Sequence, residues 1–156
     1  MGAIVEGILK NQALVSGALG WFIAQALKTM IDMYFNHSFN PERMWGSGGM
    51  PSSHSSTVCA LAVASLLKYG IESFEFAMSF LFGIVVMHDA MGVRRETGKQ
   101  AQVLNKLLFE DFLNLDGEIL TKKLKEYVGH TPLQVACGAV LGVIIALAVN
   151  TMYVSP

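Results

Sequence analysis

The sequence predicts an all-α fold, an integral membrane helical bundle that forms a single domain over residues 1–156. About four transmembrane helices and one or two amphipathic surface helices are expected. Two observations predict this class: hydrophobic residues make up 53% of the chain and charged residues only 15%, and the apolar residues gather in long runs. A soluble domain of this length rarely has such runs, which indicate helices that cross a bilayer.

The first run covers about residues 13–35 and is interrupted only by Gln25, Lys28 and Asp32. It exceeds the roughly 20 residues that are needed to cross the apolar core of a bilayer. A secretory signal peptide has a compact basic start and a continuously apolar centre, and this run has neither. We therefore expect a transmembrane helix of the mature protein.

Three further runs follow, at about residues 53–69, 74–92 and 132–154. The last two are long enough to cross a bilayer, whereas the first of the three is short and needs tilting or shielding by its neighbours. Pro132 suits the first turn of the last helix, where its missing N–H costs little. These runs complete the four expected spans.

The polar segment 93–130 between the last two spans predicts helices outside the bilayer. Over residues 99–115, apolar residues recur every three or four positions, as in an amphipathic helix that lies on the membrane surface or packs over the bundle. A second short helix is expected over residues 118–127, and Gly129 suits the position just after its end. That turn would deliver His130 to the membrane face.

Four crossings place residues 36–53 and 93–130 on one side of the membrane, together with most of the lysines and arginines. Only Lys10 and Lys68 lie on the other side. By the positive-inside rule the basic side is the cytoplasm, so both termini lie outside, and in a bacterium the membrane is the inner or plasma membrane. Basic and acidic residues are interleaved, which does not favour nucleic acid as a partner.

Residues 46–56 form a glycine and serine cluster at the start of the second apolar run. A helix start preceded by glycines presents unpaired N–H groups, which favour an anion such as phosphate. Gly49, Ser52 and Ser53 are candidate phosphate ligands, and His54 adds a proton donor beside them. The same residue types are also ordinary helix caps, so both interpretations stay open.

Two motifs carry a resemblance to a known family. Pro51-Ser52-Ser53-His54 resembles the Pro-Ser-Gly-His motif of the type 2 phosphatidic acid phosphatase superfamily, which includes acid phosphatases and vanadium-dependent haloperoxidases. The stretch Gly129–Gly138, which begins Gly-His-Thr-Pro, looks like the last motif of that superfamily. Residues 89–95 and the chain around them are similar to its divergent branch, and this resemblance covers nearly the full length.

The resemblance implies a phosphohistidine mechanism. In it His130 attacks phosphorus and His54 protonates the leaving alcohol, after which water releases phosphate. The two side chains must then lie within about 10 Å of one another to face one phosphorus. Arg94 and Arg95 are the candidate phosphate clamp, because guanidinium matches phosphate oxygens, and Lys28 is a further candidate cation. No cofactor and no metal is implied.

The chain departs from the superfamily at two supporting positions. Leu124 stands where the superfamily has an arginine, and Gln134 where it has the aspartate that orients the nucleophilic imidazole. Asp89 lies near the end of a span, where an unpaired carboxylate is costly, so it is expected to pair with Arg94, Arg95 or a histidine. It is also a candidate replacement for the missing aspartate.

Two functions remain open. The first is a phosphatase acting on a lipid or isoprenoid phosphate at the cytoplasmic leaflet, and both histidines favour it. The second is a noncatalytic protein that binds phosphorylated lipid headgroups or acts as a transport or partner subunit, and the two departures favour that one. Short spans with polar interiors favour a homo-oligomer, and Gly138 and Gly142 suit either helix packing within the chain or self-association.

Overall fold

The computed structural model describes residues 2–37, 48–108, 124, 126 and 128–154. The described part of the chain contains helices and no strand, which confirms the predicted all-α class. The helices are α1 (Gly2–Lys10), α2 (Gln12–Asn36), α3 (Ser53–Tyr69), α4 (Phe74–Met91), α5 (Val93–Lys106) and α6 (Pro132–Val154).

Polar side chains start the three helices α2, α3 and α4. Asn11 accepts a hydrogen bond from the Leu14 N–H, Ser52 from Ser55 and Ser73 from Phe76. Each cap satisfies one of the backbone N–H groups that a helix start leaves without a partner. The sequence thus fixes where each apolar run begins to coil.

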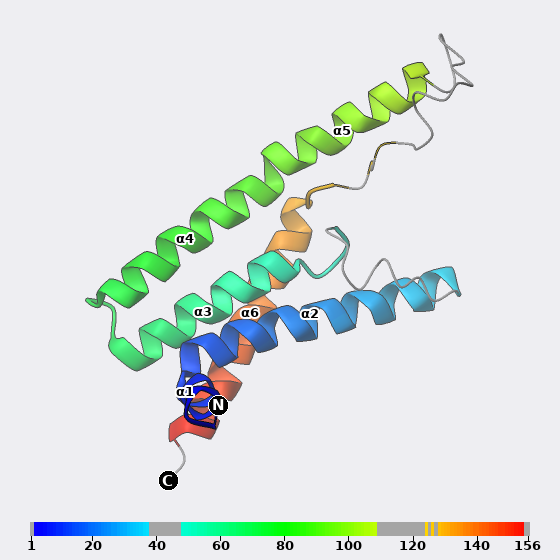
Figure 1. The fold of residues 1–156 in the computed structure, drawn as a ribbon. Coiled ribbons are helices and arrows are strands. Elements are labelled where there is room, and N and C mark those ends of the chain that lie inside the picture. Colours follow the sequence, from blue (N-terminus) through cyan, green and yellow to red (C-terminus); the bar gives the residue numbers. More distant parts are fainter. Residues whose placement is uncertain (1, 38–47, 109–123, 125, 127, 155–156) are drawn as a thin grey trace.

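Helix α3 lies in the middle of the bundle and packs against α2, α4 and α6 (Figure 1). A buried cluster of small side chains lies between the helices, namely Ala13, Ala60, Ala64 and Ala146. Helices in a membrane gain nothing from excluding water from one another, so they pack by close van der Waals contact, which small residues allow.

Three glycines bring α2 and α6 onto the backbone of α3. A Cβ atom at Gly20 would lie 2.9 Å from the Ser56 carbonyl oxygen, and one at Gly138 or Gly142 would clash with the carbonyl of Ser52 or Ser56. Gly138 and Gly142, both buried, therefore serve helix packing within the chain. They are not exposed for self-association.

Among the described residues, three stretches are long and apolar enough to cross a membrane: α2, α4 with α5 taken as one stretch, and α6. The fourth expected span, α3, has 17 residues, and its buried face is largely Ala and Ser. Its neighbours shield it, as a short span requires. Large apolar side chains of α4 and α6 point outward, where lipid would cover them; they include Phe80, Leu81, Phe82, Val85, Val140, Ile144 and Leu147.

The segment 93–130 differs from the expectation. Helix α5 begins at Val93 and not at residue 99, continues the direction of α4 and, among the helices, packs on α4 alone (Figure 1). It therefore extends beyond the end of α3 and does not cover the bundle. The remaining part of the expected amphipathic helix, residues 109–115, lies outside the described residues.

The short helix expected over residues 118–127 is wrong at Leu124 and Glu126, which are not helical; the rest of it lies outside the described residues. Asn105 on α5 explains the difference, because its side chain bonds both the N–H and the carbonyl of Leu124, each at 2.9 Å. Gly129 has a positive φ of 89°, but it ends no helix. A Cβ there would clash with the α5 backbone, and one at Gly98 would lie 2.6 Å from the Glu126 carbonyl oxygen.

Candidate functional site

Three helix ends that are far apart in the sequence meet at one end of α3. The Ser52 N–H donates to the Gln134 carbonyl at 3.1 Å, which ties the start of α3 to the start of α6. The His130 N–H donates to the Ala90 carbonyl at 2.9 Å, which ties the same region to the end of α4. These backbone bonds bring His54, the second residue of α3, beside His130.

The two imidazole rings are in contact. Their centroids lie 5.7 Å apart with the planes at 64°, well within the limit of about 10 Å set by a shared phosphorus. His130 is only 2% exposed. The Nε2 atom of His130 and the Nδ1 atom of His54 are buried and have no hydrogen-bond partner among the described residues. Buried polar atoms are nearly always bonded, so two orphans in one place point to a ligand.

Gln134 determines which nitrogen of His130 carries the proton. The Thr131 N–H donates to Gln134 Oε1 at 2.9 Å, so the atom in that position is the amide oxygen. The same oxygen lies 3.4 Å from His130 Nδ1. Because an amide oxygen only accepts, Nδ1 must hold the hydrogen, and Nε2 is left with a lone pair. That lone pair is what a nucleophile requires.

Burial lowers the pKa of His130 from 6.5 to about 4. The hydrogen bond to Gln134 acts in the opposite direction, and His54, Lys28 and Arg94 add to the lowering through their positive charge. The imidazole of His130 is therefore neutral at pH 7, as the attack on phosphorus demands.

Lys28 brings a positive charge to the histidines from α2. Its side chain is 2% exposed, and its Nζ donates to Gln25 Oε1 at 2.7 Å. Gly49, with a positive φ of 86°, packs on the stem of Lys28, where a Cβ would lie 3.1 Å from its Cγ. Lys28 and Arg94 both act electrostatically on both imidazoles.

Asp89 pairs with Arg94, one of the partners expected for it, at 2.5 Å between Oδ2 and Nε. Both side chains are about half exposed. The partner of His130 Nδ1 is Gln134 and not Asp89. The carboxylate of Asp89 thus acts electrostatically on His54 and not on His130.

Ser52 and Ser53 are buried at the start of α3. The Ser52 hydroxyl accepts from the N–H and from the hydroxyl of Ser55, at 3.4 and 3.1 Å. The Ser53 carbonyl accepts from the Thr57 hydroxyl at 2.7 Å. The contacts of the Ser52 side chain are those of a helix cap.

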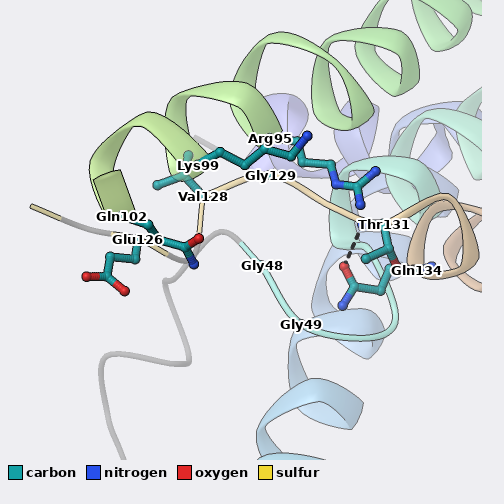
Figure 2. A pocket seen from close by; sticks show the side chains of 10 residues that line it. All are labelled: Gly48, Gly49, Arg95, Lys99, Gln102, Glu126, Val128, Gly129, Thr131 and Gln134. Atoms are coloured by element: carbon teal, nitrogen blue, oxygen red, sulfur yellow. Dashed lines mark hydrogen bonds between the residues drawn. The ribbon is translucent and has the colours of Figure 1, made fainter. Parts of the chain in front are cut away.

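Arg95 lies apart from the histidines. It lines a cavity of about 420 Å³ together with Lys99, Thr131 and Gln134, whereas neither His54 nor His130 lines it (Figure 2). The structure thus separates the two adjacent arginines, with Arg94 near the histidines and Arg95 in the cavity. In the described part of the chain no three His, Cys, Asp or Glu side chains are grouped so as to hold a metal ion.

Gln134 is the residue of this site whose role sequence reasoning missed. The segment Thr131-Pro132-Leu133-Gln134 fits a capping box, in which Thr131 Oγ1 accepts from the Gln134 N–H at 3.3 Å while Gln134 accepts from the Thr131 N–H. The Thr-x-x-Gln spacing before an apolar run is the signal that would have found it. The cap fixes the amide oxygen where His130 Nδ1 can reach it.

Comparison with known proteins covers most of the chain. A family model described as "Divergent PAP2 family" matches residues 9–145, a range that contains both histidines and all their described contacts. The Uncharacterized membrane protein YuiD of Bacillus subtilis (strain 168) is 36% identical over 149 residues, which cover 90% of this chain and 94% of that protein. No solved structure matches. With its three long apolar helices, the chain is a membrane protein.

Proposed function

The chain belongs to the divergent PAP2 family of membrane proteins, and from this premise we propose that it is a phosphatase acting on a lipid or isoprenoid phosphate. One observation carries the proposal: the rings of His54 and His130 lie 5.7 Å apart, and the His130 Nε2 has no partner among the described residues. A phosphoryl group between the two imidazoles would meet a nucleophile and an acid at once.

In the proposed reaction His130 Nε2 forms a bond to phosphorus while the bond from phosphorus to the ester oxygen breaks. The leaving alcohol takes a proton from His54. A water molecule then gives a proton to His54 and attacks the phosphohistidine, which releases inorganic phosphate and restores His130. Gln134 accepts from Nδ1–H throughout and so keeps Nε2 directed at phosphorus.

Phosphoryl transfer depends mainly on positioning and on charges around the equatorial oxygens. Lys28 and Arg94 supply positive charge from α2 and α5. Arg94 is already paired with Asp89, so an incoming phosphate would share its guanidinium, which has five N–H donors. We assign this site to the cytoplasmic face, because the loops beside it carry most of the basic residues.

A noncatalytic function as a binder of phosphorylated headgroups is the second candidate, and two observations favour it. The side chain at the superfamily's arginine position, Leu124, is 41% exposed, and only its backbone is bonded. The partner of His130 is the neutral amide of Gln134, which stabilises an imidazolium less than a carboxylate does. A site of this kind would keep the anion and lose turnover.

The decisive experiment measures phosphate release by the purified protein in detergent micelles that contain phosphatidic acid, farnesyl phosphate or a long-chain polyprenyl phosphate. His130→Gln is expected to abolish release, and His54→Gln to slow it by about 10²–10⁴-fold, the usual contribution of a general acid. His88→Gln is the matched control, because His88 is an exposed histidine near the end of α4. It should leave the rate unchanged.

Trapping adds an independent readout. With ³²P-labelled substrate, rapid denaturation in alkali should retain label on the wild type, and none on His130→Gln, because phosphohistidine survives alkali and not acid. Release no faster by the wild type than by His130→Gln on every lipid would reject the phosphatase. Phosphatidic acid binding that persists under those conditions would favour the binder.

A further inference from the structure

A second place on the molecule has the chemistry of an anion site. The cavity of about 420 Å³ lies between α5, the segment around Val128 and Gly129, and Gly48 with Gly49 (Figure 2). The Gln134 side chain lines this cavity and also contacts Nδ1 of His130, which does not line it. The cavity is therefore separate from the space beside His130 Nε2.

Arg95 and Lys99 are the cations that line this cavity. Of these two, Arg95 is the one whose side chain has no partner among the described residues. Its neighbours are paired, Arg94 with Asp89 at 2.5 Å and Lys99 with Glu96 at 2.6 Å. The side chain of Arg95, which is exposed, forms no hydrogen bond or ion pair with any residue that the structure describes. A guanidinium stays charged at all relevant pH values, so its five donors require water or an anion.

Further donors surround the guanidinium. Thr131 Oγ1 accepts from the Gln134 N–H, which leaves the hydroxyl hydrogen of Thr131 free to donate. The Gln134 oxygen accepts from the Thr131 N–H, and the amide NH₂ group of Gln134 is available to donate to a ligand. Figure 2 shows the Arg95 guanidinium reaching toward Thr131 and Gln134. Three donor groups around one space match a tetrahedral oxyanion.

The walls of the cavity are fixed by backbone contacts. Gly98 and Gly129 let the segment that contains Glu126 and Val128 touch α5, as any Cβ there would clash. Asn105 holds the same segment, donating to the Glu126 carboxylate at 2.7 Å. Lys99 is paired with Glu96, whereas Glu126 is bonded to the neutral amide of Asn105 and keeps its negative charge. Arg95 is thus the lining cation that is left to attract an anion.

We propose that this cavity is a second anion site, which binds a phosphate group through Arg95, Thr131 and Gln134. The group belongs either to the headgroup of a membrane lipid or to free inorganic phosphate. An occupant would restrain the Gln134 side chain and hence the orientation of His130. The site binds its anion whether or not the histidines catalyse phosphate release.

The test removes the histidine pair first, because that pair would also bind phosphate. In the His54→Gln, His130→Gln background, calorimetry in detergent measures binding of inorganic phosphate and of dioctanoyl phosphatidic acid. Arg95→Gln added to this background is expected to weaken binding of the preferred probe about tenfold or more, which is the loss of one charge-assisted pair. Arg95→Lys should give an intermediate loss, since it keeps the charge without the fork.

Two controls complete the design. Lys68→Gln removes an exposed positive charge at the C-terminal end of α3 and should change neither affinity. Dioctanoylglycerol, which lacks phosphate, should not bind. Tighter binding of phosphatidic acid than of phosphate identifies a lipid headgroup as the occupant, and the reverse order identifies the free anion.

Equal affinities with and without Arg95, or no binding of either probe in the histidine-free background, would overturn the proposal. Should Arg95→Gln fail to fold, Arg95→Lys alone decides. Failure of the phosphatase would appear as absent turnover with Arg95-dependent binding intact, so the two failures are distinguishable.

Discussion

Acidification should charge His130 only far below neutral pH, and the fold should lose stability as the pH falls. The pKa of His130 is about 4 in the folded protein, compared with 6.5 for a free imidazole. At about 1.4 kcal/mol for each pH unit, this difference corresponds to about 3 kcal/mol. Burial dominates it, and the charges that face the ring are Lys28 from α2, His54 from α3 and Arg94 from α5.

The sign follows from the numbers of bound protons. Between pH 6.5 and about 4 the unfolded chain binds a proton at this histidine and the folded protein does not. The contribution of His130 to the free energy of unfolding is therefore complete above pH 6.5. It falls by about 3 kcal/mol as the pH drops to 4 and below.

Nitrogen-15 NMR of histidine-labelled protein in micelles tests both the pKa and the tautomer. The His130 resonances, assigned with His130→Gln, should report a protonated Nδ1 and an unprotonated Nε2 from neutral pH down to about pH 5. A titration midpoint at or above 6.5 would refute the argument from burial. A hydrogen on Nε2 at neutral pH would refute the argument from the Gln134 oxygen.

Three further substitutions test the supports of the site. Gln134→Leu should remove the tautomer preference of the neighbouring imidazole in the same spectra, and loss of the capping box should lower the free energy of unfolding by about 1 kcal/mol. Asn105→Ala should cost about 1–3 kcal/mol and speed amide hydrogen exchange in residues 124–130; unchanged exchange would show that other contacts hold the segment. Gly142→Ala forces a Cβ onto the α3 backbone and should lower the free energy of unfolding by about 1–3 kcal/mol, and with it the thermal midpoint. Gly7→Ala, with no atom within 4 Å, is its control, and equal midpoints for the two variants would contradict the packing argument.

The helices and their starts could be predicted because they depend on residues that are close together in the chain. The helices follow from apolar runs long enough to cross a bilayer, and their starts follow from Ser52, Ser73 and Pro132, whose preferences act within one turn. The expectation failed at the start of α5, because the helical spacing did not reveal that this helix begins directly after α4, and at Leu124 and Glu126, which are not helical. The bonds from Asn105 to Leu124 join residues 19 apart, and no periodicity signals them.

The histidines illustrate the same division. Their motif positions indicate a shared site, and the sequence places Gln134 at the position of the orienting aspartate. It does not show that the Gln134 oxygen contacts His130 Nδ1, because that contact depends on three-dimensional direction. It also treats Arg94 and Arg95 as equivalent. The structure distinguishes them, since adjacent helix residues point about 100° apart and only one can face the histidines.

By itself the sequence determined that this chain is an all-helical membrane protein of the divergent PAP2 family, because composition, run length and motif order are properties of the linear chain. Only the tertiary structure decided that α3 lies at the centre, that the imidazole rings are 5.7 Å apart and that Arg95 lines a separate cavity. These outcomes depend on how closely helices approach. Glycines and small side chains set that distance, and it becomes known only when all the helices are packed together.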